Sequence, residues 1–441
     1  MKKIPFEKTL KKIGKTVKVS GWVHSIREHK NLVFLDLRDE KDLILQVVSE
    51  KKLAERINPE FVIEVEGKVL KRPEGMVNPK IETGEIEIKA EKIRILSEAK
   101  TLPFDLKNLN LSLPEYLNWF PVVLKNEKVK AIFKIQEKIV EGFREASKKL
   151  GFFEFQSPIL SALSSEGGAE VFKVDYFSKE AFLVQSPQLY KQILVSSFGK
   201  VFCVTKAFRA EPSVTSRHLC EFTSLDCEIG FIETLEELLL ICEKILKEIF
   251  KKIEKEAKKE LSLLKVELPK IPKKIPRIKL FEAGKIIFNQ ENLDDLDPEK
   301  EQKISQFFKE KENSNFVFVT HFPTLKRPFY TLPDPKNPEY SLSFDLLFDG
   351  LEIVSGSLRI HKFEDLLDSL KKRNLDSKNF QYYLLAFEYG MPPHGGFGLG
   401  LERLTKQILK LKNVREATLF VRDLKRVDLP LKEEEKENEK E

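Results

Sequence analysis

The stretch GGFGLGLERL (residues 395–404) places four glycines within six positions, directly before a Glu-Arg pair. Glycine at this density is unfavourable inside a helix, and it is used where the backbone must approach another group closely or adopt φ > 0. Beyond it, apolar residues recur at helical spacing at Leu404, Ile408, Leu409 and Leu411. The stretch therefore predicts a strand or turn that leads into a helix, and helix N-termini favour anions such as phosphate.

Two common phosphate-binding loops are excluded at this stretch. No Gly-Lys-Ser or Gly-Lys-Thr occurs in it, so it is not a P-loop. Gly396 and Gly398 have no third glycine at the dinucleotide-binding spacing, and no βαβ pattern surrounds them. Taken alone, the stretch leaves two interpretations open: a phosphate site served by Arg403, or a tight junction with a surface arginine.

Length and cysteine content restrict the class of protein. A chain of 441 residues with 41% hydrophobic residues is long enough for two or three domains. Its four cysteines lack zinc-finger spacing, which predicts a reduced, cytoplasmic chain without a zinc site. The N-terminal MKKIPFEKTLKK has no apolar core, and no run of about 18 apolar residues occurs. Neither a signal peptide nor a membrane-spanning helix is therefore expected.

The net charge of +6 is distributed unevenly. Residues 1–30 contain nine Lys or Arg against two Glu, which fits a polyanionic partner such as nucleic acid. A solvated lysine face explains the same charge and remains the alternative. Residues 431–441 are rich in Glu and Lys and are expected to form a disordered tail.

Residues 1–97 predict a small β-barrel. Strand-like alternation occurs over 17–48, 61–69 and 85–94, which corresponds to about five short strands. The OB-fold is a barrel of this kind, and it binds single-stranded nucleic acid through a basic groove and stacking aromatic side chains. Phe34 lies in the middle of a predicted strand, where it either stacks on a ligand or belongs to the core.

The remainder predicts an α+β domain over 126–430, preceded by a linker over 98–125. Its strands occur in hairpins rather than in alternation with helices, which favours an antiparallel sheet flanked by helices. Asp349-Gly350 joins two apolar runs and is a strong hairpin signal. The expected elements are a helix over 126–150, a strand that ends at Pro158, strands over 201–211 and 221–231, a helix or helix pair over 233–263, and strands over 343–348 and 351–360.

Charged residues in the segment FRAEPSVTSRHLCEF suggest a polyphosphate site. Arg209 and Glu211 are two residues apart in a predicted strand, so both side chains would point to the same face. The following loop adds Arg217 and His218 as further cationic or donor groups. Together with Arg403, these arginines can form a cage for a triphosphate, because guanidinium groups suit phosphate oxygens. Ordinary surface ion pairs are the alternative.

These residues resemble three motifs of the class II aminoacyl-tRNA synthetases, in particular the aspartate/asparagine subgroup with an N-terminal OB-fold anticodon-binding domain. Pro158 after a long helix resembles motif 1, which forms the dimer in that family. FRAE with RHLCEF resembles motif 2, and GLGLERL resembles motif 3. The resemblance runs over nearly the whole chain and implies a homodimer.

The same resemblance implies an ATP site. In that family the motif 2 arginine, here Arg209, holds the α-phosphate, and the motif 3 arginine, here Arg403, holds the γ-phosphate. Glu352 and Ser355 match the positions that bind Mg²⁺. The implied ATP-binding residues are Arg209, Glu211, Arg217, His218, Leu219, Phe222, Glu352, Gly400, Leu401, Glu402 and Arg403.

Shorter stretches resemble the amino-acid pocket of the aspartyl enzymes. Gln188 in QSPQLYKQ is implied to bind the α-amino group, and Lys191 and Arg359 the side-chain carboxylate. Such a pair of cations would select aspartate, because asparagine would leave both undercompensated. The implied aspartate-binding residues are Glu166 in the loop SSEGGAEVF, Gln188, Lys191, Arg209, Ser355 and Arg359.

The implied reaction is the activation of L-aspartate with ATP to aspartyl-adenylate, followed by transfer to the 3′ end of tRNA(Asp). Phe34 and Gln46 match positions that stack on and read the central anticodon base. In archaeal-type aspartyl enzymes, a tryptophan close to the position that His24 occupies in this chain is associated with strict tRNA(Asp) recognition. A histidine there is associated with charging of tRNA(Asn) as well. His24 therefore raises the expectation that tRNA(Asn) is also a substrate, with a solvent-exposed strand residue as the alternative.

Other functions remain open at this point. An asparaginyl enzyme shares all three motifs, although Lys191 and Arg359 argue against it. A non-catalytic RNA-binding paralogue would be expected to lose Arg209, Glu211, Glu352 or Arg403, and the chain has all four. An ammonia-dependent asparagine-forming ligase uses a related core without a barrel. The chain also departs from the family pattern at 117–126, at 212–214 and at Val421.

Overall fold

The computed structural model describes residues 1–162, 170–212, 214–291 and 293–430. The chain forms two compact units, one of residues Met1–Ser112 and one that begins at Leu113. The stretch 98–125, expected to be a linker, contains two short helices, α2 (Leu113–Asn118) and α3 (Phe120–Val123), which belong to the second unit. Among the described residues, no helix is both long enough and apolar enough to cross a membrane.

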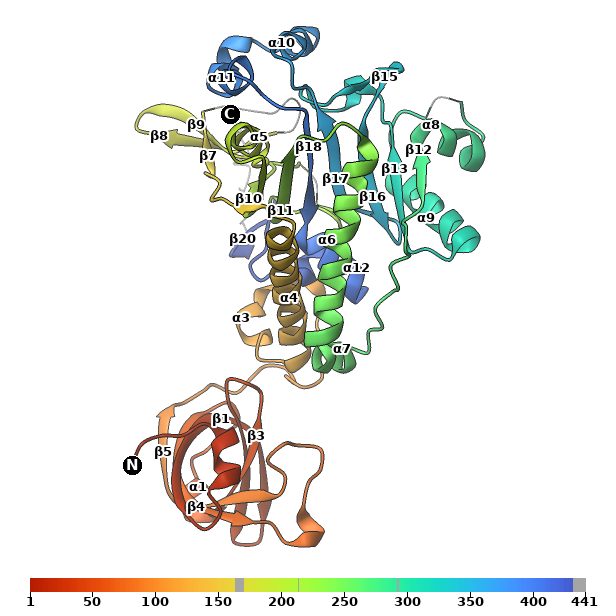
Figure 1. The fold of residues 1–441 in the computed structure, drawn as a ribbon. Coiled ribbons are helices and arrows are strands. Elements are labelled where there is room, and N and C mark those ends of the chain that lie inside the picture. Colours follow the sequence, from red (N-terminus) through yellow and green to blue (C-terminus); the bar gives the residue numbers. More distant parts are fainter. Residues whose placement is uncertain (163–169, 213, 292, 431–441) are drawn as a thin grey trace, which may run out of the picture. The chain divides into compact units, whose positions relative to one another are not determined.

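The first unit is a closed five-stranded barrel, as expected from the alternation in the sequence (Figure 1). Its strands pair in the order β1-β2-β3-β5-β4. On β2, Val33, Leu35 and Leu37 fill the interior while Phe34 points outward and stays half-buried. The elements are η1 (Phe6–Lys11), β1 (Thr16–His29), β2 (Leu32–Arg38), β3 (Ile44–Glu50), α1 (Lys51–Ala54), β4 (Val62–Lys71), η2 (Glu74–Met76) and β5 (Ile86–Ser97).

The second unit is built on an eight-stranded sheet in the order β12-β13-β16-β17-β18-β11-β10-β6. The strands from β13 to β10 are antiparallel, but the outermost pairs β12–β13 and β10–β6 are parallel, so the sheet is mixed rather than purely antiparallel. Its strands are β6 (Phe153–Glu154), β10 (Lys200–Phe208), β11 (Glu221–Gly230), β12 (Arg277–Lys279), β13 (Phe316–Thr320), β16 (Ser343–Phe348), β17 (Leu351–Arg359) and β18 (His394–Gly400).

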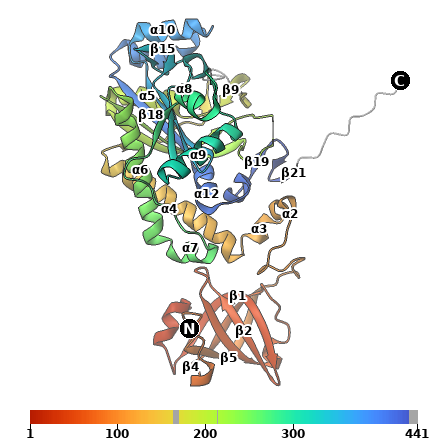
Figure 2. The ribbon, with the colours of Figure 1, turned by 90° about the vertical axis from the view of Figure 1, so that its right-hand side faces the viewer.

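Helices cover both faces of this sheet (Figures 1 and 2). Phe202 on β10 packs in the core with α4 (Glu127–Lys149), α6 (Leu235–Glu256), α7 (Lys258–Leu264) and α12 (Leu401–Leu409). Its neighbours Val201 and Cys203 pack instead with α5 (Gln188–Phe198), α10 (Phe363–Lys372) and α11 (Gln381–Glu388). Because successive strand residues point to opposite faces, these two clusters lie on opposite sides of the sheet.

Shorter elements complete the second unit. A third apolar cluster packs α8 and α9 beside β12 and β13 at one edge of the sheet. The remaining elements are β7 (Leu160–Ser161), β8 (Lys173–Tyr176), β9 (Lys179–Leu183), α8 (Leu280–Ala283), the π-helix η3 (Gly284–Phe288), α9 (Pro298–Glu312), η4 (Thr324–Lys326), β14 (Pro333–Asp334), β15 (Asn337–Ser341), η5 (Ser377–Phe380), η6 (Val414–Ala417), β19 (Arg422–Asp423), β20 (Arg426–Val427) and β21 (Leu429–Pro430).

Most of the predicted elements are confirmed, but two strands end earlier than expected. The strand expected to reach Pro158 is only Phe153–Glu154, and proline cannot donate to a ladder. The strand expected to include Arg209 and Glu211 ends at Phe208, because the Ala210 N–H donates to the Glu170 carbonyl instead of to the hairpin partner. Arg209 is therefore exposed rather than buried in a strand.

The Asp-Gly hairpin is confirmed. Asp349 and Gly350 both have positive φ, 44° and 79°, between the end of β16 and the start of β17. Two central residues with positive φ are the signature of a tight turn whose twist matches that of the strands it joins. The expected helix or helix pair is a pair, α6 and α7, interrupted at Ala257.

None of the glycines of β18 has positive φ, and some of them, such as Gly396, are needed for close approach. A Cβ atom on Gly396 would lie 2.0 Å from Glu228 Oε2 and 2.3 Å from the Cys227 carbonyl oxygen. A Cβ atom on Gly400 would meet nothing closer than Arg403 Cβ, at 3.7 Å. The two glycines thus differ in what surrounds them, although both lie in the same strand.

We predict that Gly396→Ala destabilises the protein strongly and that Gly400→Ala does not. The added methyl group at position 396 overlaps backbone and a buried carboxylate, and overpacking of this kind costs about 1–3 kcal/mol or more. Thermal unfolding followed by circular dichroism measures both variants. Equal midpoints for the two variants would contradict this account of the glycines.

Candidate active site

A cavity of about 820 Å³ opens on the face of the sheet opposite α4 and α6. Alternation along three neighbouring strands produces it. Apolar residues of β11 and β18, such as Leu225 and Leu399, point into the helical core, while polar residues and glycines point into the cavity. The cavity-lining residues on these strands are Phe222, Ser224, Asp226, Glu352, Ile353, Ser355, Gly356, Ser357, Arg359, Gly398 and Gly400.

One end of the cavity holds a buried network of four charges. Lys191 Nζ lies 2.8 Å from Asp226 Oδ2 and 3.2 Å from Glu228 Oε2. Arg359 Nε donates to Glu228 Oε1 at 2.8 Å, and its Nη2 donates to Gln188 Oε1 at 3.0 Å. The network joins α5, β11 and β17, and the Lys191 ammonium also donates to the backbone carbonyl of Phe397 on β18.

Lys191, Glu228 and Arg359 have pKa values shifted toward their charged forms. Burial opposes the charge of Lys191, but Asp226 and Glu228 outweigh it and raise the lysine pKa. Burial likewise opposes the charge of Glu228, but Arg359 and Lys191 outweigh it and lower the pKa of that carboxyl. Two cations and two carboxylates therefore balance before any ligand binds.

Sequence reasoning missed Asp226 and Glu228. Considered alone, Lys191 and Arg359 suggested two cations without protein partners in the substrate pocket. In the structure, Lys191 pairs with Asp226 and Arg359 pairs with Glu228. The signal was available, because Ser224, Asp226 and Glu228 alternate with Leu225 and Cys227 in the segment SLDCE. Polar residues at every second position of a strand whose other face is buried indicate a lined cavity.

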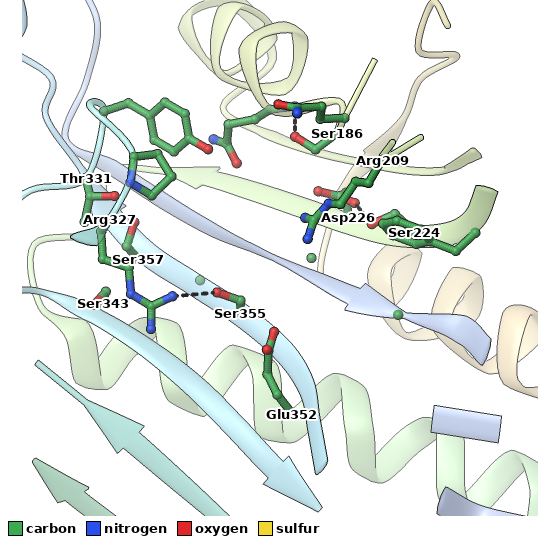
Figure 3. Close-up of a pocket in the computed structure, with 18 of the residues that line it drawn as sticks. Ser186, Arg209, Ser224, Asp226, Arg327, Thr331, Ser343, Glu352, Ser355 and Ser357 are labelled. Atoms are coloured by element: carbon green, nitrogen blue, oxygen red, sulfur yellow. Dashed lines mark hydrogen bonds between the residues drawn. The ribbon is translucent and has the colours of Figure 1, made fainter. Parts of the chain in front are cut away.

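The other end of the cavity is lined by several arginines, of which Figure 3 labels Arg209 and Arg327. Arg209 lies over the ring of Phe222, with its guanidinium carbon 5.5 Å from the ring centroid. Arg403 Nη1 lies 3.3 Å from Glu352 Oε2, and its Nε donates to the Arg217 carbonyl at 3.3 Å. The three arginines expected from the sequence thus line one cavity, as the cage interpretation requires.

Carboxylates accompany these arginines. Glu211 and Glu352 line the cavity. Burial would raise the pKa of Glu352, but Arg403, Arg327 and Arg209 outweigh it and keep the pKa low. Glu301 on α9 forms an ion pair with Arg217, and burial raises the Glu301 pKa to about 7 despite that partner. No local sequence pattern indicates Glu301, because it lies on a polar helix 84 residues from its partner.

Arg327, which Figure 3 shows beside Ser355, forms a further arginine–carboxylate pair next to β17. Its Nη2 donates to Asp345 Oδ2 at 2.6 Å, and its Nη1 donates to Ser355 Oγ at 3.3 Å. Asp345 Oδ1 is buried without a hydrogen-bond partner among the described residues. No group of three or more His, Cys, Asp or Glu in the described ranges forms a ready-made metal site.

Several expected ATP-site residues contribute in a different way. His218 lines the cavity, but burial lowers its pKa, so it is a neutral donor or acceptor rather than a cation. Glu402 accepts the Thr223 N–H with both oxygens at 3.0 Å and so ties α12 to β11. Leu401 packs in the core and does not line the cavity. Leu219, Phe222 and Gly400 line it as expected.

Glu166, expected in the amino-acid pocket, lies outside the described residues. The remaining residues expected there, Gln188, Lys191, Arg209, Ser355 and Arg359, all line the cavity. Gln188 is already engaged, because its Nε2 lies 3.4 Å from Glu228 Oε2 while its Oε1 accepts from Arg359. The structure thus brings the two sequence-predicted residue sets into a single space.

Two of the three barrel residues expected to read an anticodon, Phe34 and Gln46, lie on the outer side of β2 and β3, where Gln46 is buried by its neighbours. Phe34 and Asp36 alternate with buried residues on β2, and Gln46 on β3 pairs with Asp36. Gln46 Oε1 accepts from Arg27 Nη2 at 3.2 Å, and its Nε2 donates to Glu87 Oε2 at 2.9 Å. Phe34 is therefore not a core residue, which removes the alternative left open by the sequence.

His24 lies at an irregularity in β1. The β1–β2 register shifts between Val23 and Ser25, so His24 falls in the bulge. Its side chain is half-buried, and burial together with Lys107 lowers its pKa. His24 is thus a partly covered, neutral side chain rather than a fully exposed one.

Residues 117–424 match the family model described as tRNA synthetases class II (D, K and N). The chain belongs to this family. Residues 17–96 match an OB-fold nucleic acid binding domain, which agrees with the barrel of this synthetase.

Relatives resemble the synthetase along most of its length. It is 39% identical over 433 residues to the aspartate–tRNA(Asp/Asn) ligase of Aeropyrum pernix, covering 94% of this chain and 96% of the relative. It is 37% identical over 428 residues to the aspartate–tRNA(Asp) ligase of Pyrococcus horikoshii, covering 94% and 96%. Among solved structures, asparaginyl-tRNA synthetase from Pyrococcus horikoshii with asparaginyl-adenylate has a TM-score of 0.87 at 30% identity, covering 98% of this chain and 100% of that one.

We predict that Glu228→Gln lowers the free energy of unfolding by about 3–5 kcal/mol, because it leaves the buried Arg359 charge without its partner. Urea denaturation followed by circular dichroism measures the change. Glu180→Gln is the matched control: its ion pair with Lys173 is exposed, and its loss is expected to cost under about 0.5 kcal/mol. A similar small effect for both variants would show that the network does not hold the sheet and α5 together.

Proposed function

We propose that the synthetase is an aspartate–tRNA ligase, which activates L-aspartate with ATP and transfers it to tRNA(Asp). The observation that carries the proposal is the single cavity with Lys191 and Arg359 at one end and Arg209, Arg217 and Arg403 at the other. A cavity with cationic side chains at both ends suits a small carboxylate ligand at one end and a polyphosphate at the other. The curated relatives that share most of the chain length support the choice of aspartate.

At the amino-acid end, Lys191 and Arg359 are the proposed partners of the aspartate side-chain carboxylate. Lys191 Nζ already donates to Asp226 Oδ2 and to the carbonyl oxygens of Cys227 and Phe397. Because an ammonium group has three N–H donors, the substrate carboxylate binds Lys191 by replacing one of these acceptors. Asparagine would present an NH₂ group to these donors, and a site built around specific polar pairs discriminates strongly against such a mismatch. Gln188 and Glu166 remain the proposed partners of the α-amino group.

At the phosphate end, Arg209 is the proposed partner of the α-phosphate and Arg403 of the γ-phosphate. The α-carboxylate of aspartate attacks the α-phosphorus, and the bond to pyrophosphate breaks. Arg209 stabilises the charge that develops on the phosphoryl oxygens. The remaining proposed ATP contacts are Glu211, Arg217, His218, Leu219, Phe222, Glu352 and Gly400, with Glu402 and Leu401 acting by positioning α12. No protein nucleophile is required, since the cavity aligns the two substrates.

Mg²⁺ fits the donors beside the phosphate end. Glu352 and Ser355 supply oxygen atoms, and the buried Asp345 Oδ1 has no hydrogen-bond partner among the described residues. Magnesium prefers oxygen ligands and is commonly held by one or two carboxylates together with substrate phosphates. When bound, Mg²⁺ would neutralise phosphate charge. Among the described residues, no group of three or more His, Cys, Asp or Glu surrounds this position, so substrate phosphates would supply the remaining ligands.

A homodimer is also part of the proposal. Large apolar side chains are exposed near Pro158: Phe153, Ile159, Leu160 and Phe198. Phe153 stacks on Phe198 with ring centroids 4.4 Å apart, and Phe231 is 78% exposed beside them at a shallow hollow shared with Phe198. Exposed apolar groups of this size favour a protein partner. Sedimentation velocity at micromolar concentration distinguishes a dimer from a 51.2 kDa monomer.

The domain assignment and cellular location complete the proposal. Residues 1–97 would bind the anticodon, 126–430 would catalyse the reaction, and 98–125 would connect them, in the cytoplasm. The outward-facing Phe34 and the hydrogen-bonded Gln46 support anticodon binding, because stacking on aromatic side chains and edge readout are how OB-folds bind single strands.

We predict that the protein catalyses ATP–pyrophosphate exchange with aspartate and, at equal concentration, at least about 10³-fold less efficiently with asparagine. Chelation of divalent cations should abolish exchange, and added Mg²⁺ should restore it.

Arg209→Ala and Arg403→Ala should each lower exchange by about 10²-fold or more, because each removes a donor to developing phosphate charge. Preference for asparagine would instead identify an asparaginyl enzyme, and no exchange with either amino acid would support a non-catalytic paralogue.

We further propose that tRNA(Asn) is also a substrate. Wild-type protein should attach aspartate to transcripts of tRNA(Asp) and tRNA(Asn) with efficiencies within about tenfold, or ~1.4 kcal/mol. His24→Trp should favour tRNA(Asp) by a further tenfold or so, since one contact near a base changes selectivity by about 1–3 kcal/mol. His29→Trp, at the exposed end of the same strand, is the control. A several-hundredfold preference of the wild type for tRNA(Asp) would show strict recognition.

A further inference from the structure

The Arg217 side chain faces the cavity on one side and a buried carboxylate on the other. One side faces the cavity, which Arg217 helps to line. The other side meets Glu301 on α9, whose carboxylate pairs with Arg217 Nη2 but does not line the cavity. The carboxylate therefore reaches the guanidinium from behind the cavity wall.

Glu301 is built into this position. It is 7% exposed, and Arg217 is the only cation within salt-bridge distance of it among the described residues. The same carboxylate oxygen lies 3.4 Å from the backbone N of Glu352. Glu301 thus contacts both a cavity arginine and the start of the strand that carries Glu352.

The surroundings of Arg217 explain why it needs such support. It lies in the connection between β10 and β11, where the hairpin ladder has already ended. Its backbone is fixed by Thr215 Oγ1, which accepts the Arg217 N–H, and by Arg403 Nε, which donates to the Arg217 carbonyl. Among the described residues, Glu301 is the only hydrogen-bond acceptor of the long Arg217 side chain. An arginine side chain without such a partner loses much conformational freedom when it binds a ligand.

We propose that Glu301 is a positioning residue, which holds the Arg217 guanidinium against the cavity wall and presents its remaining N–H groups to the phosphates of ATP. This inference rests on the proposed function of the cavity as an ATP site. A guanidinium has five N–H donors in a fixed plane, so a bond to Glu301 from behind leaves donors for a ligand in front. Because the two partners approach from different sides, ATP need not displace Glu301.

The charge balance supports positioning rather than competition. Glu352 pairs with Arg403 at 3.3 Å, and Glu301 supplies the matching carboxylate for Arg217. Without Glu301, the Arg217 guanidinium would lose the side-chain acceptor that it has among the described residues. Loss of Glu301 should therefore weaken ATP binding and leave the amino-acid end unaffected.

The test compares Glu301→Ala, Glu301→Gln and the control Glu299→Ala in ATP–pyrophosphate exchange. Glu299 lies on the same helix but is exposed and pairs only with Lys303 in the part of the chain described. Glu301→Ala should raise the KM for ATP by about tenfold while the KM for aspartate stays within about twofold. Glu301→Gln, which keeps an oxygen acceptor for Arg217, should recover most of the loss, and Glu299→Ala should behave as wild type. An unchanged or lower KM for ATP, or an equal rise for both substrates, would overturn the proposal.

A double-mutant cycle with Arg217→Ala shows whether Glu301 acts through Arg217. In that background Glu301→Ala should change the KM for ATP by less than about twofold, whereas independent effects would multiply. Multiplying effects would overturn the proposal. If Glu301→Ala does not fold, Glu301→Asp takes its place, because the shorter side chain keeps the charge but cannot reach Arg217 in the same geometry.

Calorimetric titration with ATP alone separates this inference from the proposed function. Weaker ATP binding by Glu301→Ala, in a protein that shows no aspartate-dependent exchange, would support the positioning role and contradict the aspartate assignment. Equal ATP affinity of Glu301→Ala and wild type, together with normal aspartate exchange, would contradict the positioning role and support the aspartate assignment. If wild-type protein does not bind ATP, both proposals fail.

Discussion

The buried network of Lys191, Asp226, Glu228 and Arg359 is the interaction on which the rest of the cavity depends. Four charges in a space closed to water are tolerated only when each is paired and hydrogen-bonded, because removal of one partner leaves an uncompensated buried charge. Here the pairs connect α5, β11 and β17, and a lysine hydrogen bond to the Phe397 carbonyl adds β18. The same contacts that hold these elements together therefore also orient the N–H groups proposed to meet the substrate.

Strand alternation explains how one sheet provides both a core and a polar cavity. Leu225, Cys227 and Leu399 pack against the long helices, and the residues between them face the opposite side. Glycine at every second position of β18 leaves space on the polar side. The restriction is strongest at Gly396, because Glu228 occupies the space that a side chain would need. Two of these glycines, Gly396 and Gly398, thus leave the space that Glu228 and Asp226 occupy. The helix that carries Arg403, the proposed partner of the γ-phosphate, follows the same strand.

Features encoded by neighbouring residues could be predicted from the sequence, and features created by distant ones could not. The barrel strands follow from alternation, and the hairpin follows from Asp349-Gly350. The end of β10 before Arg209 could not be predicted, because it depends on a hydrogen bond from Ala210 to Glu170. Glu301 was missed for the same reason: nothing near it in sequence shows that it faces Arg217. The resemblance to known motifs named the residues that line the cavity but not the ones that support them from behind.

The junction between β18 and α12 has no loop, since the strand ends at Gly400 and the helix begins at Leu401. Arg403 lies within the first turn of the helix, so the end of the strand determines which way its side chain points. A helix advances by about 100° per residue, so one inserted or deleted residue here would turn the arginine away from the cavity altogether. The length of this segment is thus as strictly fixed as its composition, and variation in this region can be accommodated only beyond the C-terminal end of the helix.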